Sequence, residues 1–292
     1  MRSLLFVPGD SERKLEKGFA SGADVVIVDL EDSVAPDNKA AARKIAADFI
    51  ADRRGSAGPR VYVRVNDLSS GLTDDDLAAI VAALPHGIML PKCTGGADVQ
   101  HLSLKLRVHE AECALPDGAI RLIPIITETA ASLFGGATYA GASQRLAGLT
   151  WGAEDLSAAI GASHTRDADG RYTDVFRHAR AMTILAAAAA GVAAVDTVVP
   201  DFRDLARFET ECIEAARDGF TAKMAIHPAQ VPVINAVFTP SPEAVAHARA
   251  LVDAFVSAGD PGVIAIGGKM YDRPHLRRAE QLLLRAAAVA GK

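Results

Sequence analysis

The sequence predicts an α/β fold, a closed (β/α)8 TIM barrel followed by a C-terminal helical lid segment. Three observations support this fold class: eight short apolar runs occur along the chain, helical stretches alternate with them, and polar residues directly follow most of them. Strands separated by helices run parallel. A barrel of this kind takes roughly 250 residues, and the chain has 292. An open doubly wound sheet is the alternative.

The eight predicted strands are short runs rich in branched apolar residues and bounded by turn residues. They are residues 3–9, 24–32, 60–67, 87–93, 121–128, 145–152, 192–199 and 220–228. The clearest helices between them are predicted at residues 12–21, 36–54, 73–84, 175–191 and 201–219. The longest interval contains the polar stretch 163–174, which we expect to be a loop or lid near the site.

The chain divides into two predicted parts. Residues 1–238 form the catalytic barrel, and residues 239–292 form a lid and oligomerisation segment. The stretch "TPSPEA" at the boundary contains two prolines and a serine and is typical of a hinge. The tail of about 50 residues is small for an independent domain. We therefore expect it to pack on the barrel or on a neighbouring subunit.

Composition excludes several classes of partner. The net charge of −5 does not favour nucleic acid. The cysteines Cys93, Cys113 and Cys212 are widely spaced, and no CxxC pair indicates a zinc site or a disulfide framework. The apolar stretch "ILAAAAAGVAAVDTVV" is broken by Gly191 and Asp196 and falls short of a membrane span. We expect a cytoplasmic protein with no nucleic-acid or membrane partner.

Polar side chains follow the predicted strands at the end where β/α barrels carry their chemistry. In chain order these residues are Asp29, Glu31, Asp32, Arg64, Asn66, Asp67, Lys92, Glu128, Glu154, Asp155 and His227. Their position at successive strand ends predicts that one rim of the barrel is the active site.

Two of these carboxylates are candidate metal ligands. Glu128 and Asp155 end consecutive strands, and neighbouring parallel strands lie about 4.8 Å apart. Oxygen ligands in small number suit Mg²⁺, which binds one or two carboxylates together with waters and substrate oxygens. The alternative is that each acid caps the helix that follows it, in "TETAAS" and "EDLSAA".

The remaining rim residues leave further alternatives open. Arg64 offers a planar fork to a carboxylate or carbonyl oxygen of a substrate, or it forms a structural ion pair with Asp29 or Glu31. Lys92 is a positioning charge or, as the weaker alternative, a Schiff-base lysine. His227, just before a proline, is a base or only ends its strand.

Eight motifs occur in order between Arg2 and Leu276, and together they are specific. They are "RSLLFVPGD", "DVVIVDLEDSV", "RVYVRVND", "LPKC", "ITETA", "WGAEDL", "AIHPAQV" and "GKMYDRPHL". They closely resemble the HpcH/HpaI aldolase and citrate lyase β-subunit family, which includes malyl-CoA lyase and citramalyl-CoA lyase. The resemblance implies a barrel that cleaves or forms a carbon–carbon bond between an acetyl-type CoA thioester and a 2-oxo acid, with Mg²⁺ or Mn²⁺.

The resemblance also implies roles for individual residues. It implies that Glu128 and Asp155 hold the metal, and that Arg64 is catalytic and binds a substrate oxygen. It implies that Asp272 of "KMYDRP" is the catalytic base, supplied by the C-terminal segment and in relatives often by an adjacent subunit. The candidate substrate contacts are Arg64, Glu154, Asp29 and Glu31, and the candidate contacts for the CoA portion are Lys14 and His227.

The expected partners are therefore an acyl-CoA and a 2-oxo acid, within a homo-oligomer that is a trimer or hexamer. Malyl-CoA and citramalyl-CoA differ by a methyl group, which is worth only ~1–3 kcal/mol of discrimination, so the substrate stays open. Three other functions also stay open: a citrate lyase β subunit whose thioester is carried by an acyl carrier protein, an aldolase for free hydroxy-oxo acids, and a non-catalytic binding subunit.

Overall fold

The computed structural model describes residues 1–291, and the chain divides into two compact units. The N-terminal unit spans Arg2–Asn235, and the C-terminal unit comprises Ala236–Lys292 together with Met1. The division falls within helix α8 (Gln230–Phe238), close to the boundary expected from the sequence.

All eight strands predicted for the N-terminal unit are present, each shorter than its apolar run. They are β1 (Ser3–Pro8), β2 (Val25–Asp29), β3 (Arg60–Arg64), β4 (Gly87–Leu90), β5 (Arg121–Pro124), β6 (Gly148–Thr150), β7 (Ala193–Asp196) and β8 (Ala222–Ala225). They form one parallel sheet in the order β5-β4-β3-β2-β1-β8-β7-β6.

The first and last strands of this order, β5 and β6, meet and close the barrel. Parallel bridges join Leu122 to Leu146 and Ile125 to Thr150. The backbone N–H of Ile126 also donates to the carbonyl of Thr150 over 2.9 Å. The closed barrel is therefore confirmed, and the open doubly wound alternative is wrong.

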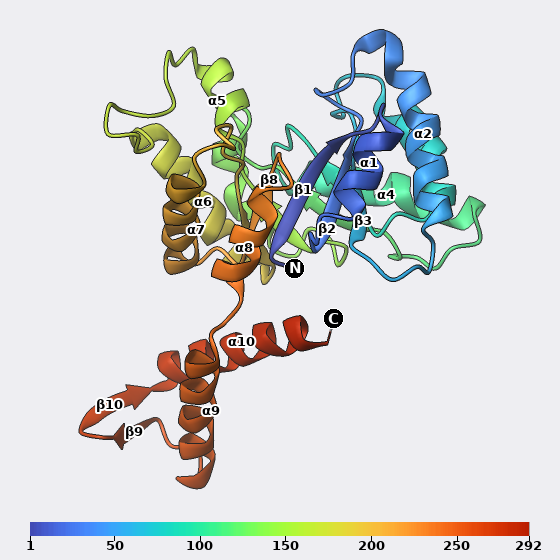
Figure 1. Ribbon diagram of the computed structural model, residues 1–292. Helices are drawn as coiled ribbons and strands as arrows, with labels where there is room; N and C mark the ends of the chain where they lie inside the picture. The colour runs from blue at the N-terminus through green and yellow to red at the C-terminus, as the bar shows by residue number, and fades with distance from the viewer. Residues whose placement is uncertain (292) are drawn as a thin grey trace. The chain divides into compact units, whose positions relative to one another are not determined.

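Helices surround the strands of the barrel. They are α1 (Glu12–Phe19), α2 (Lys39–Asp52), α3 (Thr73–Ile80), α4 (Gly96–Glu112), α5 (Ala153–Ile160), α6 (Asp174–Ala190) and α7 (Leu205–Asp218), with 3₁₀ turns at Pro36–Asn38, Val81–Ala83 and Ser132–Tyr139. Helix α1 packs against β1 and β2, and α6 packs against β6 and β7 (Figure 1).

One predicted helix begins later than the sequence suggested. Helix α7 starts at Leu205 and not at Asp201, because Asp204 takes the N-cap position. Its carboxylate accepts from the backbone N–H of Arg207 over 3.0 Å. Such a cap satisfies one of the free N–H groups of the first turn and fixes where the helix begins.

The single tryptophan is hydrogen-bonded to a buried carboxylate at the end of β7. Trp151 is fully buried, and its indole N–H donates to Asp196 at the end of β7 over 2.8 Å. The Lys223 ammonium lies 2.6 Å from Oδ2 of Asp196, and Nε of Arg180 lies 3.5 Å from Oδ1, the oxygen that accepts from Trp151. These partners lower the pKa of Asp196 although burial acts to raise it. Lys223 is therefore a paired structural lysine.

A second charged cluster lies where β5 and β6 begin, around the buried Glu110 and Arg145. We call Glu110, Arg145 and the exposed Asp117 the seam cluster. The guanidinium of Arg145 donates to both carboxylate oxygens of Glu110, over 2.7 and 2.6 Å, and also to Asp117. Glu110 also accepts from the backbone N–H groups of Gly118 and Ile120. The cluster ties the segments that lead into the two strands closing the barrel.

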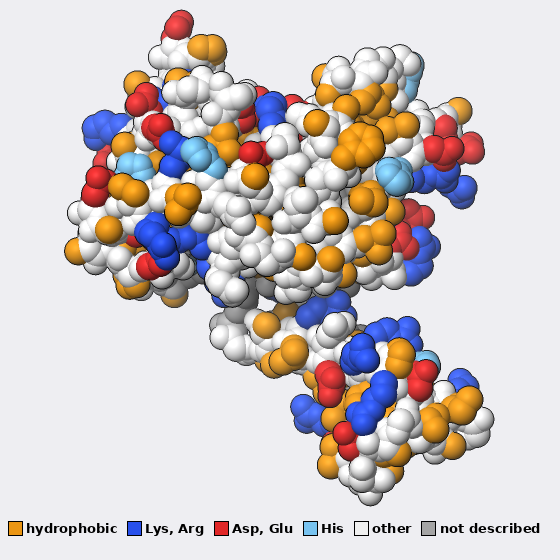
Figure 2. Space-filling view, turned by 180° about the vertical axis from the view of Figure 1, so that it is seen from behind, with side chains coloured by type: hydrophobic (Ala, Val, Ile, Leu, Met, Phe, Trp, Pro, Cys, Tyr) orange, Lys and Arg blue, Asp and Glu red, His pale blue; other side chains and the backbone are white. Residues whose placement is uncertain are grey.

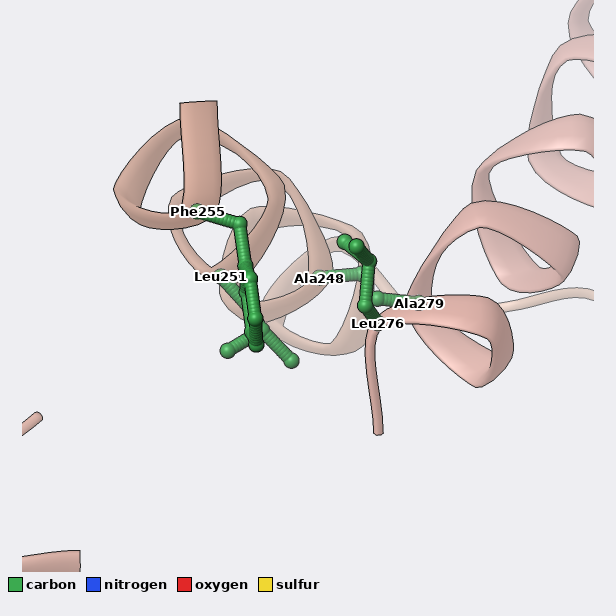
Figure 3. Packing of buried hydrophobic residues seen from close by; sticks show 5 residues of the cluster. All are labelled: Ala248, Leu251, Phe255, Leu276 and Ala279. Atoms are coloured by element: carbon green, nitrogen blue, oxygen red, sulfur yellow. The ribbon is translucent and has the colours of Figure 1, made fainter. Parts of the chain in front are cut away.

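The C-terminal unit is a helix, a hairpin and a helix around its own small core. Its elements are α9 (Pro242–Ser257), β9 (Val263–Ile266), β10 (Lys269–Asp272) and α10 (Arg273–Ala290). The hairpin turns at Gly267 and Gly268, both at positive φ, as a two-residue hairpin turn requires. Ala248, Leu251 and Phe255 of α9 pack with Leu276 and Ala279 of α10 in this core (Figure 3).

The C-terminal unit holds both basic and acidic side chains, and its arginines are concentrated on one helix. Helix α10 carries Arg273, Arg277, Arg278 and Arg285. Lys and Arg side chains gather on the face of this unit that Figure 2 shows. Within residues 1–291, no helix has both the length and the apolar character needed to span a membrane.

Candidate active site

A bidentate ion pair joins the rim residues of β2 and β3. Asp29 and Arg64 are the last residues of their strands and are register partners. The Nε of Arg64 donates to Oδ1 of Asp29 over 2.8 Å, and its Nη2 donates to Oδ2 over 2.7 Å. The ion pair that the sequence left open as an alternative for Arg64 is therefore present.

Asp29 is occupied by neighbours within the protein. Its Oδ1 also accepts from the backbone N–H of Glu31, and its Oδ2 accepts from that of Ser33. Burial acts to raise the pKa of Asp29, but the hydrogen bonds and charge of Arg64 outweigh it and the pKa is lowered. Asp29 is thus an ionised anchor that orients Arg64.

The third nitrogen of Arg64 faces the rim. Its Nη1 lies 2.9 Å from Oε2 of Glu31 and 3.5 Å from Asp32, and the side chain of Arg64 is 11% exposed. Burial acts to lower the pKa of Arg64, but Asp29 and the nearby carboxylates raise it. Arg64 is therefore a fixed cation with one nitrogen directed toward the acids of the rim.

Lys92 links the strand ends of β2, β4, β5 and β6. Its backbone has a positive φ of 51°, an uncommon conformation for a non-glycine residue. Its backbone N–H donates to Oε2 of Glu128 over 2.5 Å, and its ammonium lies 2.5 Å from Oε1 of Glu31. The ammonium is also 3.8 Å from Asp155. Lys92 thus lies among the carboxylates of the rim, and its role as a positioning charge stays a prediction.

Glu128 lies across the end of β6 in a space that only glycine leaves open. A Cβ on Gly152 would come within 2.9 Å of Cγ of Glu128. Glu128 is 3% exposed. Burial, followed by the charge of Asp155, raises the pKa of Glu128 to about 8. The next helical turn begins at Ser132 with Ala131 as its N-cap, so the alternative in which Glu128 caps that helix is wrong.

Asp155 approaches from the neighbouring strand. It lies in the first turn of α5, whose N-cap is Gly152, and its side chain is 33% exposed. The residues joined by these contacts are hereafter the rim cluster: Asp29, Glu31, Asp32, Arg64, Lys92, Glu128 and Asp155. The cluster holds five carboxylates and two cations, so it carries a surplus of negative charge.

The rim cluster fits a divalent cation with few protein ligands. Within residues 1–291, no group of three or more His, Cys, Asp or Glu side chains is placed to hold a metal. Mg²⁺ needs only one or two carboxylates beside waters and substrate oxygens. The raised pKa of Glu128 reports a carboxylate that lacks compensating charge. A cation between Glu128 and Asp155 would supply that charge.

The other predicted site residues lie outside the rim cluster. Glu154 is exposed and lines a cavity of about 220 Å³ with Arg166 and Asp204. The ring of His227 stacks on Phe202 with centroids 4.5 Å apart. Lys14 is exposed on α1. Their roles toward substrate or CoA stay predictions.

Asp272 belongs to the C-terminal unit. It is the N-cap of α10 and forms a capping box with His275. Its side chain is 52% exposed, and the hydrogen bond with His275 lowers its pKa. Asp272 therefore caps α10, and at neutral pH its carboxylate is ionised.

A larger cavity of about 640 Å³ lies between α6, α7 and the loop of residues 163–173, and no residue of the rim cluster lines it. Its lining is rich in arginine, but acidic neighbours pair with several of these side chains. Arg166 lies 2.9 Å from Glu211, and Arg180 lies 2.6 Å from Asp218. The mutual pairing describes a cross-linked helix interface rather than a second catalytic centre.

One polar residue behind the rim, Lys39, was not predicted from the sequence. Lys39 contacts the loop that carries Glu31, and Asn66, which was expected at the rim, is buried beside Asp76. The sequence feature that could have revealed Lys39 is its place at the start of a helix, where the helix dipole favours an acid and not a lysine.

Comparisons with known proteins show what this chain is similar to. The family model described as HpcH/HpaI aldolase/citrate lyase matches residues 2–228. The chain is 35% identical to a (3S)-malyl-CoA thioesterase of Cereibacter sphaeroides, over 99% of this chain and 95% of that protein. It is 33% identical to the mitochondrial citramalyl-CoA lyase of Rattus norvegicus, over 100% of this chain and 87% of that protein.

A solved structure extends the likeness to three dimensions. The protein CitE from Mycobacterium tuberculosis, crystallised in complex with magnesium, acetoacetate and coenzyme A, superposes with a TM-score of 0.77. It is 36% identical in sequence, and the match covers 98% of each chain.

Proposed function

Because this chain belongs to the HpcH/HpaI aldolase/citrate lyase family, we propose that it is a Mg²⁺-dependent carbon–carbon lyase acting on CoA thioesters. The substrate is a 3-hydroxyacyl-CoA such as malyl-CoA or citramalyl-CoA, which is cleaved to acetyl-CoA and a 2-oxo acid or formed from them. The observation that carries the proposal is the surplus of carboxylates at the rim beside the fixed cation of Arg64.

The rim residues divide the work of such a reaction. Glu128 and Asp155 would hold the metal, which supplies Lewis-acid and orienting chemistry when bound. The Nη1 of Arg64 lies at the open side of its fork and can donate to a substrate oxygen as negative charge develops there. Asp29 keeps that fork in one orientation. The ion pair between Glu31 and Lys92 joins the residues that follow β2 and β4.

Asp272 is the proposed base. The reaction needs a group that takes the hydroxyl proton in cleavage or a methyl proton of acetyl-CoA in condensation. Asp272 is ionised at neutral pH, as its ordinary pKa of 3.8 already ensures, and its half-exposed side chain can meet a substrate. We propose that the C-terminal unit brings this carboxylate to a rim within a homo-oligomer, a trimer or hexamer, with Lys14, His227 and Glu154 contacting the CoA portion and the substrate.

The direct test is to incubate the pure protein with acetyl-CoA, Mg²⁺ and a panel of 2-oxo acids. Mass spectrometry should detect a condensed 3-hydroxyacyl-CoA with glyoxylate or pyruvate. Free CoA released from malyl-CoA without acetyl-CoA would instead indicate thioester hydrolysis. Turnover only with a thioester on an acyl carrier protein would indicate the citrate lyase alternative. No turnover of any thioester would contradict the proposal.

The role of Asp272 is tested by Asp272→Asn. Asparagine remains a good N-cap, so the variant should fold and bind Mg²⁺ normally. Loss of a general base costs roughly 10²–10⁴ in rate, and we expect turnover to fall at least ~100-fold. Wild-type turnover in this variant would leave Asp272 only its capping role.

A mixing experiment tests whether the base crosses between subunits. Asp272→Asn and Glu128→Ala variants, each inactive alone, should partly restore activity when their subunits exchange. A mixture that stays inactive after light scattering has confirmed exchange would place the base within its own subunit.

A cytoplasmic location, also expected from the sequence, is tested by fractionating the source cells.

A further inference from the structure

Lys39 stands at a position where helix physics disfavours a cation. It is the first residue of α2, directly after the 3₁₀ turn Pro36–Asn38. The positive end of the helix dipole favours acids there and disfavours lysine. The side chain is half-buried, while Lys44 on the same helix is 78% exposed. The placement of Lys39 therefore calls for an interaction outside the helix.

That interaction uses every proton of the ammonium group. The Nζ of Lys39 donates to the carbonyl of Leu30 over 2.7 Å, to the carbonyl of Glu31 over 2.7 Å and to Oδ1 of Asn66 over 2.8 Å. A lysine ammonium has three donors and no acceptor. Charge-assisted hydrogen bonds of this length are among the stronger ones in proteins. Lys39 thus clamps two consecutive peptide groups of the loop after β2.

The third acceptor is itself fixed from behind. The side-chain amide of Asn66 donates to the Leu30 carbonyl over 3.1 Å and to Asp76 over 2.7 Å. The backbone N–H of Asn66 donates to the same oxygen of Asp76 over 2.7 Å. Asp76 is fully buried and pairs with Arg43 at 2.7 Å. The clamp therefore rests on a hydrogen-bonded network reaching from α2 through α3 to the loop.

The clamped loop presents Glu31 to the rim. Oε1 of Glu31 accepts from Lys92. Its Oε2 is buried and has no hydrogen-bond partner among residues 1–291, although Nη1 of Arg64 lies 2.9 Å away outside hydrogen-bond geometry. A buried acceptor without a hydrogen bond is costly, so the backbone must hold it in place.

We propose that Lys39 is a positioning residue for the lyase reaction. By gripping the carbonyls of Leu30 and Glu31, it holds the Glu31 carboxylate at a fixed distance from Arg64 and Lys92, with Oε2 left to accept from a donor of the bound substrate. This proposal rests on the proposed function, because the substrate hydroxyl is the donor it requires. A misplacement of about 1 Å in such a group can cost ~10²-fold in rate.

The first test replaces Lys39 by methionine, which keeps the length and apolar stem but removes all three donors. We expect kcat for condensation to fall at least ~10-fold. The Mg²⁺ dissociation constant measured by calorimetry should stay within ~2-fold, because Glu128 and Asp155 come from other strands. Lys44→Met, which removes only an exposed pair with Asp48, is the matched control and should keep wild-type kcat.

The second test restores the ammonium chemically. Cys113 is exposed while Cys93 and Cys212 are buried, so Lys39→Cys is made in a Cys113→Ser background. Treatment with 2-bromoethylamine then builds a lysine analogue at position 39, and most of the lost kcat should return. The Cys113→Ser protein treated in the same way is the control. A kcat that stays low after complete modification would overturn the positioning role.

A third readout does not depend on turnover. Hydrogen–deuterium exchange of residues 29–35 should speed up in Lys39→Met and stay unchanged in the seam cluster. If the wild-type protein turns over no thioester, the proposed function fails while faster exchange still reports the clamp. If the wild type is active and Lys39→Met keeps wild-type kcat, the positioning proposal is overturned and the proposed function stands.

Discussion

Two clusters of charged residues, each built around buried carboxylates, lie near opposite ends of the barrel strands, and their charges are balanced in different ways. In the seam cluster, Arg145 and two backbone N–H groups together give both oxygens of Glu110 partners. Burial acts to raise the pKa of Glu110, but these partners outweigh it and the pKa is lowered. The seam cluster is arranged to keep its charges in the folded state.

The rim cluster shows the opposite balance. Burial raises the pKa of Glu31 to about 7, although Arg64 and Lys92 act to lower it. Burial and Asp155 raise the pKa of Glu128 to about 8. The contrast teaches that burial of acids does not by itself mark a functional site. The distinguishing feature is burial without enough compensating charge, which a bound cation or substrate can supply.

The largest expected loss of activity comes from removing a proposed metal ligand of the rim cluster. Asp155→Asn removes a ligand charge but keeps the size of the side chain. We expect Mg²⁺ binding to disappear in calorimetry and condensation to fall by at least ~10³-fold, because metal stabilisation of developing charge is worth several kcal/mol. Asp48→Asn, on the exposed face of α2, is the control. Normal Mg²⁺ affinity in Asp155→Asn would place the metal elsewhere.

The next effect concerns the fork of Arg64. Arg64→Lys keeps the charge but cannot span both oxygens of Asp29. We expect it to lose at least ~10²-fold in kcat, as the loss of one donor to a developing oxyanion typically costs, and to be nearly as inactive as Arg64→Ala. Arg60→Lys, at the exposed start of the same strand, should be normal. Near-wild-type turnover in Arg64→Lys would mean that charge alone suffices.

The smallest effect on activity is expected at the seam. Glu110→Gln leaves Arg145, which is 6% exposed, without its main partner. Breaking a buried pair costs about 3 kcal/mol or more of unfolding free energy, so urea denaturation should show a clear loss while kcat is unchanged. A large fall in kcat with unchanged stability would remove the distinction between the two clusters.

The pH dependence of that loss has a defined sign. The pKa of Glu110 is lowered in the folded state from its ordinary value of 4.5. The stability that its ionised form contributes is therefore full above about pH 4.5 and is lost as the pH falls through the lower folded value. The difference between wild type and Glu110→Gln should shrink below that pH. A constant difference down to pH 3 would contradict the assignment.

The sequence was informative about the barrel because its strands are continuous apolar runs with polar residues directly after them. Barrel geometry then brings residues such as Arg64, Glu128 and Asp155 to one rim, although they are far apart in the chain. Strand ends were overestimated, since β5 ends at Pro124 although Ile125 and Ile126 continue the apolar pattern and Ile125 forms only an isolated bridge.

The pairings within the rim could not be predicted in the same way. The sequence left Arg64 with two alternatives, and the register of β2 and β3 decides for Asp29. The contacts of Lys92 depend on one positive φ angle, and those of Lys39 depend on carbonyl directions in a loop. Backbone conformation of this kind has no hydrophobic period to reveal it.

The central claim is that the uncompensated acids of the rim form a Mg²⁺ site, and its most direct test is denaturation with and without Mg²⁺ at pH 8. Wild type should gain about 2.7 kcal/mol at a hundredfold excess of Mg²⁺ over its dissociation constant. Glu128→Gln should be at least as stable as the metal-free wild type, because it removes a poorly compensated buried acid, and should gain nothing from Mg²⁺. An equal Mg²⁺ gain in both proteins, or none in the wild type, would contradict the account.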